Sequence, residues 1–263
     1  MDASNPPLLA LMRPASYREK SEKIARAFGF EPVYAPMIRL EGIKDEGFEP
    51  FIKRVVEGSS DYVIFTSANG IIFTLDKLSE SEKESFTESL KQRKILAIGP
   101  NTQRELEKIG ISESFMPGDY SSTGIVEALG PEVKGKTVDI ARSAYGAKVL
   151  VEGLRECGAT VHETHVYTLG MPEGPLQQEL IERTLAGEVR VFAFTSSMMV
   201  RNFLKHAEKA GAGETIKEAL SRALVGAIGT PTADTLRNHG IKVDVVPDEF
   251  TFDALLAVLK KKL

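Results

Sequence analysis

Short apolar runs alternate along the chain with segments whose apolar residues recur at helical spacing. The first run, residues 8–12, precedes such a segment at residues 16–28, and Gly29 ends it. Continuous short apolar runs are typical of strands that are covered on both faces of a parallel sheet. Strands that alternate with helices of about 10–15 residues predict right-handed βαβ units. The pattern therefore predicts an α/β fold with two doubly wound, parallel-sheet lobes.

The predicted elements follow one another in the same order in each half of the chain. In the first half they cover residues 8–12, 16–28, 31–38, 62–65, 94–98, 102–109 and 114–116, with a last helix through Ile125 and Leu129. In the second half they cover residues 137–141, 148–156, 160–168, 190–194, 223–228, 233–238, 243–246 and 252–259. Pro32 and Pro36 confine residues 31–38 to a sheet edge or a connection, because proline cannot donate to a ladder.

The two halves also share sequence at matched positions. Phe65-Thr66-Ser67 recurs as Phe194-Thr195-Ser196, 129 residues later, and Ala97-Ile98-Gly99 recurs as Ala227-Ile228-Gly229, 130 residues later. Pro117-Gly118-Asp119-Tyr120 likewise matches the segment from Pro247 to Phe250. Because separate segments keep one register, we interpret the chain as two copies of one domain-sized module.

Charge, cysteine count and the pattern of apolar residues argue against several function classes. The 33 Lys and Arg residues against 37 Asp and Glu leave a net charge of −4, whereas a protein that binds nucleic acid through phosphates is usually basic. The one cysteine, Cys157, cannot form an internal disulfide or a zinc cluster, which fits a reducing cytoplasm. Residues 1–11 lack the pattern of a signal peptide, residues 2–7 are expected to be frayed, and no apolar run reaches the ~18 residues of a membrane span.

Small and hydroxyl-bearing residues follow the predicted strands. At the carboxyl ends of parallel strands, unpaired backbone N–H groups of the next helix can bind an anion. The same residue types are also ordinary helix N-caps, and at any one position we favour capping. Their recurrence at matched positions favours a ligand cleft between the lobes. The candidates are Thr66, Ser67, Asn69, Gly99 and Thr102 in one copy, and Thr195, Ser196, Ser197, Gly229, Thr230 and Thr232 in the other.

Motifs for cofactors and metals are missing from the sequence. Gly211-Ala212-Gly213 lacks the third glycine of a dinucleotide loop and follows no predicted strand. His162 and His165 are three residues apart, so on a strand they would point to opposite faces. We therefore predict no cofactor, no metal and no nucleophilic triad.

The order of these motifs carries a family resemblance. Phe65-Thr66-Ser67, Ile98 to Thr102, Pro117 to Ser121, Val166-Tyr167, Phe194-Thr195-Ser196 and Ile228 to Thr232 together resemble uroporphyrinogen-III synthase over residues 8–259. The resemblance implies two flavodoxin-like lobes joined by a two-stranded connection. Mapped here, the connection lies at residues 31–40 and 160–169. The implied lobes are residues 1–36 with 172–263, and residues 39–168.

The same resemblance implies a reaction. Hydroxymethylbilane, a linear tetrapyrrole, loses its hydroxyl, closes through a spiro intermediate with ring D inverted, and gives uroporphyrinogen III. Tyr167 would donate a proton to the leaving hydroxyl, and Thr232 would hydrogen-bond the substrate. Arg142 and Gly146 match a loop that grips carboxylates, and Arg13 occupies the equivalent place in the first copy.

Two positions depart from the family pattern. Met198 stands where the family often has serine, and Ala147 where it often has arginine, so anion binding would depend more on backbone amides.

Two other functions remain open. A non-catalytic, two-lobed cytosolic binder of a small anionic metabolite is the main alternative, because fold alone does not decide function. A nucleotide-sugar transferase is the other. The expected form is a monomer that binds a small tetrapyrrole, and no nucleic acid or membrane.

Overall fold

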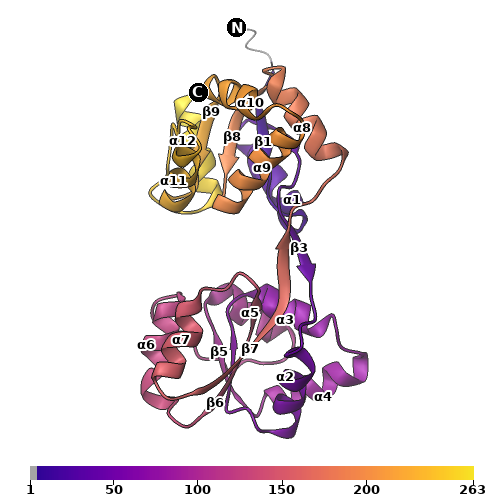
Figure 1. Ribbon diagram of the computed structural model, residues 1–263, viewed down its shortest axis with the longest axis vertical. Coiled ribbons are helices and arrows are strands. Elements are labelled where there is room, and N and C mark those ends of the chain that lie inside the picture. Colours follow the sequence, from indigo (N-terminus) through magenta and orange to yellow (C-terminus); the bar gives the residue numbers. More distant parts are fainter. Residues whose placement is uncertain (1–4) are drawn as a thin grey trace. The chain divides into compact units, whose positions relative to one another are not determined.

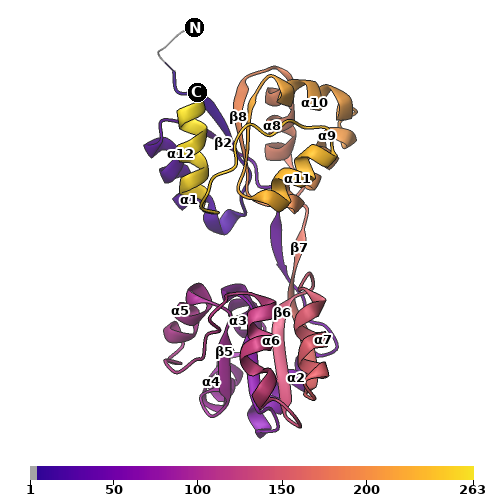
Figure 2. The same cartoon turned by 90° about the vertical axis from the view of Figure 1, so that its left-hand side faces the viewer.

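The computed structural model of the protein describes residues 5–263 (Figures 1 and 2). The first residues of the segment predicted to be frayed, up to position 4, lie outside the described residues. The described chain divides into two compact units: unit 1 holds the residues up to Arg39 and Gly170–Leu263, and unit 2 holds Leu40–Leu169. In each unit, helices pack on a sheet whose core strands run parallel, so the predicted α/β class is confirmed.

Unit 1 is built on four parallel strands in the order β2-β1-β8-β9. Its strands are β1 (Leu8–Leu11), β2 (Glu31–Tyr34), β8 (Val189–Phe194) and β9 (Leu224–Ala227). Its helices are η1 (Ala15–Tyr17), α1 (Arg18–Ala27), α8 (Pro175–Leu185), α9 (Ser197–Lys209), α10 (Gly213–Ser221), α11 (Thr230–Asn238) and α12 (Phe252–Lys262). Figure 2 shows α1 and α12 together on one face of the sheet, with α8 to α11 on the other.

Unit 2 is built on five strands in the order β3-β7-β6-β4-β5. Its strands are β3 (Arg39–Gly42), β4 (Tyr62–Phe65), β5 (Lys94–Ala97), β6 (Thr137–Ser143) and β7 (Thr160–Gly170). Its helices are α2 (Phe48–Glu57), α3 (Ala68–Leu75), α4 (Glu80–Leu90), α5 (Pro100–Lys108), α6 (Ser122–Leu129), η2 (Gly130–Glu132) and α7 (Lys148–Glu156). One apolar core lies under α2 to α5 and a second under α6 and α7, so both faces are covered.

Two predicted strands prove to be single bridges. Residues 114–116 meet the sheet only where Phe115 pairs with Leu96, and residues 243–246 only where Val245 pairs with Gly226. Pro117 and Pro247 follow these segments, and a proline has no N–H with which to extend a ladder. The prediction of longer strands was therefore wrong there. The segment 31–38 does form an edge strand, but only over Glu31–Tyr34.

The sequence repeat is visible in the structure. By position in the two copies, β1, β2, β4 and β5 correspond to β6, β7, β8 and β9. The order of strands in each unit is then the same: second, first, third, fourth. Each unit takes its first two of these strands from one copy and its last two from the other. The units therefore exchange halves of the two sequence copies.

In the described part of the chain, no helix is long and apolar enough to cross a membrane.

Candidate functional site

Unit 2 gathers several predicted residues at the carboxyl edge of its sheet. Ser67 follows β4 and caps α3, because its hydroxyl accepts the backbone N–H of Gly70 at 3.1 Å. A Cβ at Gly70 would lie 2.8 Å from the carbonyl oxygen of Ala141, so glycine lets α3 pack closely on β6. Capping, the ordinary interpretation of Ser67, is confirmed.

Tyr167 lies on β7 beside this helix cap. Its hydroxyl is 2.9 Å from the Ser67 hydroxyl, and either oxygen can be the donor. Its ring stacks on Phe73 of α3 with the centroids 5.3 Å apart, and only 7% of the residue is exposed. The structure therefore brings two predicted residues, Tyr167 and Ser67, into direct contact.

The other candidates of this edge lie along the neighbouring helix starts. Thr66 and Asn69 are half-buried near the start of α3. Gly99 is the N-cap of α5, and Thr102, in the first turn, is 2% exposed. These residues occupy the positions that a carboxylate at the helix N-termini would approach, and their binding roles stay predictions.

Arg142 is held within unit 2. Its Nε and Nη2 both lie 2.6 Å from Glu163 Oε1, and its Nη1 donates to the carbonyl of Ala147 at 2.8 Å. A Cβ at Gly146 would lie 2.5 Å from the guanidinium, so only glycine leaves room for it. Arg142 therefore fixes the loop that follows β6, and its role in gripping a substrate carboxylate stays a prediction.

Glu163 links this loop to a histidine. The His165 Nε2 atom lies 3.0 Å from Glu163 Oε1, and the His165 backbone N–H donates to Asp45 at 2.7 Å. Burial acts to raise the pKa of Glu163, but the bonds from His165 and Arg142 outweigh it and hold that pKa below its ordinary value. Within residues 5–263, no three His, Cys, Asp or Glu side chains are grouped so that they could hold a metal ion.

Unit 1 repeats the capping arrangement without a tyrosine. Ser196 caps α9 by accepting the Met199 N–H at 3.2 Å, and Gly229 caps α11. Ser197 donates to the carbonyl of Pro231 at 2.9 Å, which ties the start of α9 to α11. The remaining candidates here are Thr195, half-buried, Thr230, exposed, and Thr232, 5% exposed in the first turn of α11.

Arg13 follows β1 and is engaged inside unit 1. Its Nη1 donates to the Ser21 hydroxyl at 3.0 Å, and its guanidinium lies over the rings of Tyr17 and Phe252, 4.6 and 4.8 Å from their centroids. Burial lowers the pKa of the Arg13 guanidinium. These contacts anchor Arg13 between α1 and α12, and its contact with substrate stays a prediction.

Two exposed aromatic residues, one in each unit, lie beside the glycine that caps a helix and were not among the predicted site residues. Tyr120 is 57% exposed and lies beside Gly99, where a Cβ would be 3.4 Å from its ring. Phe250 is 69% exposed and lies beside Gly229 in the same way. The repeated segments that begin at Pro117 and Pro247 carried the signal, because they place an aromatic residue at the same position of each copy.

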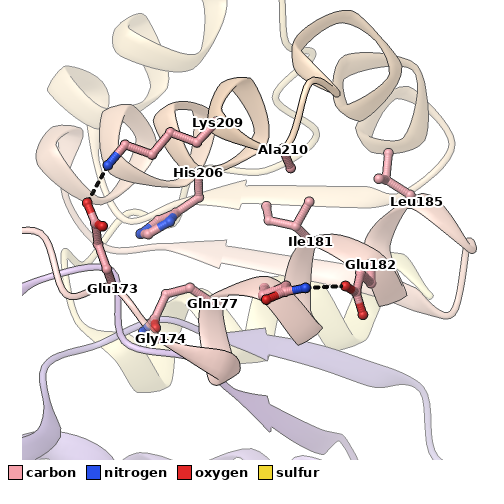
Figure 3. A pocket seen from close by; sticks show the side chains of 10 residues that line it. Glu173, Gly174, Gln177, Ile181, Glu182, Leu185, His206, Lys209 and Ala210 are labelled. Carbon is pink, nitrogen blue, oxygen red and sulfur yellow. Dashed lines mark hydrogen bonds and ion pairs between the residues drawn. The ribbon is translucent and has the colours of Figure 1, made fainter.

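A cavity of about 510 Å³ lies elsewhere in unit 1, between α8 and the end of α9 (Figure 3). Glu173 and Lys209 form an ion pair at this cavity. His206 beneath them is 9% exposed, burial lowers its pKa, and its Nε2 has no hydrogen-bond partner. None of the predicted site residues lines this cavity.

Comparison with known proteins points to one family. A family model described as uroporphyrinogen-III synthase HemD matches residues 19–257. A putative uroporphyrinogen-III synthase of Methanothermobacter thermautotrophicus is 31% identical over 254 residues, covering 95% of this chain and 96% of that protein. A uroporphyrinogen-III synthase of Chlorobaculum parvum is 30% identical over 189 residues, covering 72% of this chain and 74% of that protein.

Solved structures show the same fold. A mutant uroporphyrinogen III synthase of Thermus thermophilus matches with a TM-score of 0.63 at 22% identity, covering 97% of this chain and 98% of that chain. The synthetase of Helicobacter pylori matches with a TM-score of 0.63 at 18% identity, covering 98% of this chain and 100% of that chain.

Proposed function

This chain belongs to the uroporphyrinogen-III synthase family, and we propose that it cyclises hydroxymethylbilane with inversion of ring D and release of water. The function is thus one of tetrapyrrole biosynthesis. The geometric observation that carries the proposal is the Tyr167 hydroxyl, held 2.9 Å from Ser67 at the start of α3. An elimination of water with ring closure makes the enzyme a lyase.

The two units are, in this proposal, the two flavodoxin-like lobes of the family. The support is the strand order, which by copy position is second, first, third, fourth in each unit, as in flavodoxin-like sheets. β3 and β7 are neighbours in the sheet and serve as the two-stranded connection. The proposed lobes are residues 1–36 with 172–263, and residues 39–168; the limits of the compact units lie within three residues of these, at Arg39/Leu40 and Leu169/Gly170.

Tyr167 acts as the general acid. Its phenol proton passes to the departing hydroxyl of the substrate, the carbon–oxygen bond breaks, and water leaves. The substrate is then a cationic, N-protonated azafulvene, and Tyr167 is a phenolate. The oxygen of Tyr167 can accept a hydrogen bond from Ser67 while its own proton faces the substrate, since a hydroxyl both donates and accepts. The proton that the product releases on regaining pyrrole aromaticity restores the phenol.

The remainder of the task is positional. Ring D attacks through its substituted α-carbon, and the spiro intermediate opens and closes again with ring D inverted. The protein must bring that carbon nearer than the free one, which is an effect of orientation rather than of added reactivity. In this proposal the helix N-termini at Ser67, Gly99, Ser196 and Gly229 bind substrate carboxylates through backbone N–H groups.

Product analysis tests the function. We expect purified protein to convert hydroxymethylbilane mainly to the type III isomer, whereas buffer alone gives the symmetric type I isomer. The measurement is chromatographic separation of the two isomers after oxidation. A product that stays type I would reject the proposal. Binding of the substrate without any change in isomer ratio would support the non-catalytic binder instead.

A further inference from the structure

Both ends of α3 contact the strand that carries Tyr167. At the start of the helix, the Ser67 hydroxyl lies 2.9 Å from the Tyr167 hydroxyl. Just beyond its end, Lys77 Nζ donates to the carbonyl of Val166, the residue directly before Tyr167, at 2.6 Å. Between these two contacts, Phe73 stacks on the Tyr167 ring. The Val166 carbonyl, the Tyr167 ring and the Tyr167 hydroxyl are thus all held by α3 together with its N-cap residue and the turn that follows it.

We propose that Lys77 is a positioning residue for Tyr167: by holding the Val166 carbonyl, it sets the depth and angle at which the phenol meets its acceptor. This inference rests on the proposed function, because a positioned phenol matters only if Tyr167 takes part in the reaction. Lys77 touches neither the phenol hydroxyl nor the substrate in this scheme. It acts through the backbone of β7.

The surroundings of Lys77 make this contact costly to lose. Its ammonium lies 5.7 and 5.5 Å from the ring centroids of Phe48 and Phe73, and it also donates to the Phe73 carbonyl at 2.5 Å. Burial lowers the pKa of Lys77. A partly desolvated ammonium is stable only when its protons are bonded, so both carbonyls constrain where it can lie.

The opposite side of this cluster is closed by β3. A Cβ at Gly42 would lie 3.1 Å from the Phe73 ring and 3.6 Å from Lys77 Nζ. A Cβ at this position would therefore press on Phe73 and would be in ordinary van der Waals contact with Lys77. A shorter side chain at position 77 would lie farther from the Val166 carbonyl, and an uncharged one such as Met would have no N–H group to donate to it.

The second copy of the module offers an internal comparison. Residues 129 positions apart correspond here, and the pairs are Phe73 with Asn202, Lys77 with His206, Val166 with Met37, and Tyr167 with Ile38. In unit 1, Asn202 Nδ2 donates to the carbonyl of Met37 at 2.7 Å. Both units therefore fasten the equivalent carbonyl from the equivalent helix. Only in unit 2 does a hydroxyl-bearing residue follow that carbonyl.

This comparison separates a structural role from a positioning role. If the bond served stability alone, its loss would have the same consequence in both units. If Lys77 positions Tyr167, its loss alone should impair turnover. Asn202 is therefore a matched control, because it makes the same kind of bond and is followed by Ile38.

A double-mutant cycle tests the proposal on the full-length protein. We expect Lys77→Met to lower kcat about tenfold with KM changed less than about twofold, because a small misplacement of a catalytic group can cost that much. In a Tyr167→Phe background, the same substitution should lower kcat less than about twofold, because residues that act through one group are not additive. Asn202→Leu should lower Tm to a similar degree and leave kcat within about twofold of the wild type.

Different failures have different meanings. Equal losses of kcat from Lys77→Met in both backgrounds, or a matching loss from Asn202→Leu, would overturn the positioning role while leaving the enzyme function intact. A wild-type protein that yields no type III product would instead overturn the proposed function. Should Lys77→Met show no cooperative unfolding, Lys77→Arg, which keeps the charge but changes the reach, serves in the same cycle with the same expected non-additivity.

Discussion

At the scale of single residues, the site depends on groups that perform two tasks at once. Ser67 caps a helix and also bonds to Tyr167. Arg142, expected to grip substrate, is bonded to Glu163 and to the Ala147 carbonyl. Residue type and position indicated that both Ser67 and Arg142 matter. Their partners, 100 and 21 residues away, could not be predicted, because a contact of that range depends on strand pairing.

Tyr167→Phe tests the role of the phenol. We expect kcat to fall about 100-fold, the size of a typical general-acid contribution, while stability falls only about 1 kcal/mol for one lost hydrogen bond. Steady-state kinetics and urea unfolding measure the two effects. Tyr62→Phe is the control, because Tyr62 is also buried in unit 2 and its hydroxyl is also bonded, to Glu132 at 3.1 Å. Unchanged turnover in Tyr167→Phe would remove this residue from the mechanism.

At the scale of elements, one buried ion pair fastens α2 to the centre of the unit 2 sheet. Asp139 of β6 is fully buried, and Arg54 of α2 contacts both of its carboxylate oxygens, with Nη2 2.6 Å from Oδ1. The equivalent residue of the first copy is Ala10, also fully buried. The two modules thus use the same strand position in chemically different ways, which the repeat register alone does not reveal.

Loss of Arg54 should therefore be expensive. We expect Arg54→Met to destabilise the protein by about 3–5 kcal/mol, because it leaves the Asp139 carboxylate buried without its partner. Lys53→Met is the control on the same helix, since its ion pair with Glu57 is largely exposed, and it should change stability by less than about 0.5 kcal/mol. Urea unfolding measures both variants. A loss below about 1 kcal/mol for Arg54→Met would contradict this account.

At the scale of the whole molecule, the sequence copies and the compact units do not coincide. Unit 2 is one continuous segment, Leu40–Leu169, whereas unit 1 is made of two segments. Both ends of unit 2 lie at neighbouring strands, because β3 is next to β7 in the sheet. A continuous segment with its own core and neighbouring ends can fold by itself.

Two fragments of similar length test this division. We expect residues 40–169 to fold by themselves, with a cooperative thermal transition in far-UV circular dichroism. Residues 5–130, which hold a whole sequence copy, should not fold, because β4 then lacks its neighbour β6 and β1 lacks its neighbour β8. Cooperative unfolding of the second fragment alone would mean that the sequence copy, rather than the compact unit, is the folding unit.

The sequence by itself determined the alternation of strands and helices, the duplication and its register, the helix caps and the family. These are local properties, because a strand, a helix turn or a cap is set by residues within a few positions of one another. The family resemblance already implied that each unit combines segments of both copies, whereas the order of the strands within each sheet was decided by the tertiary structure. It alone decided that Lys77 and Ser67 meet β7 at adjacent residues. Those contacts join residues about a hundred positions apart, and their geometry follows from sheet order and packing, which no local pattern encodes.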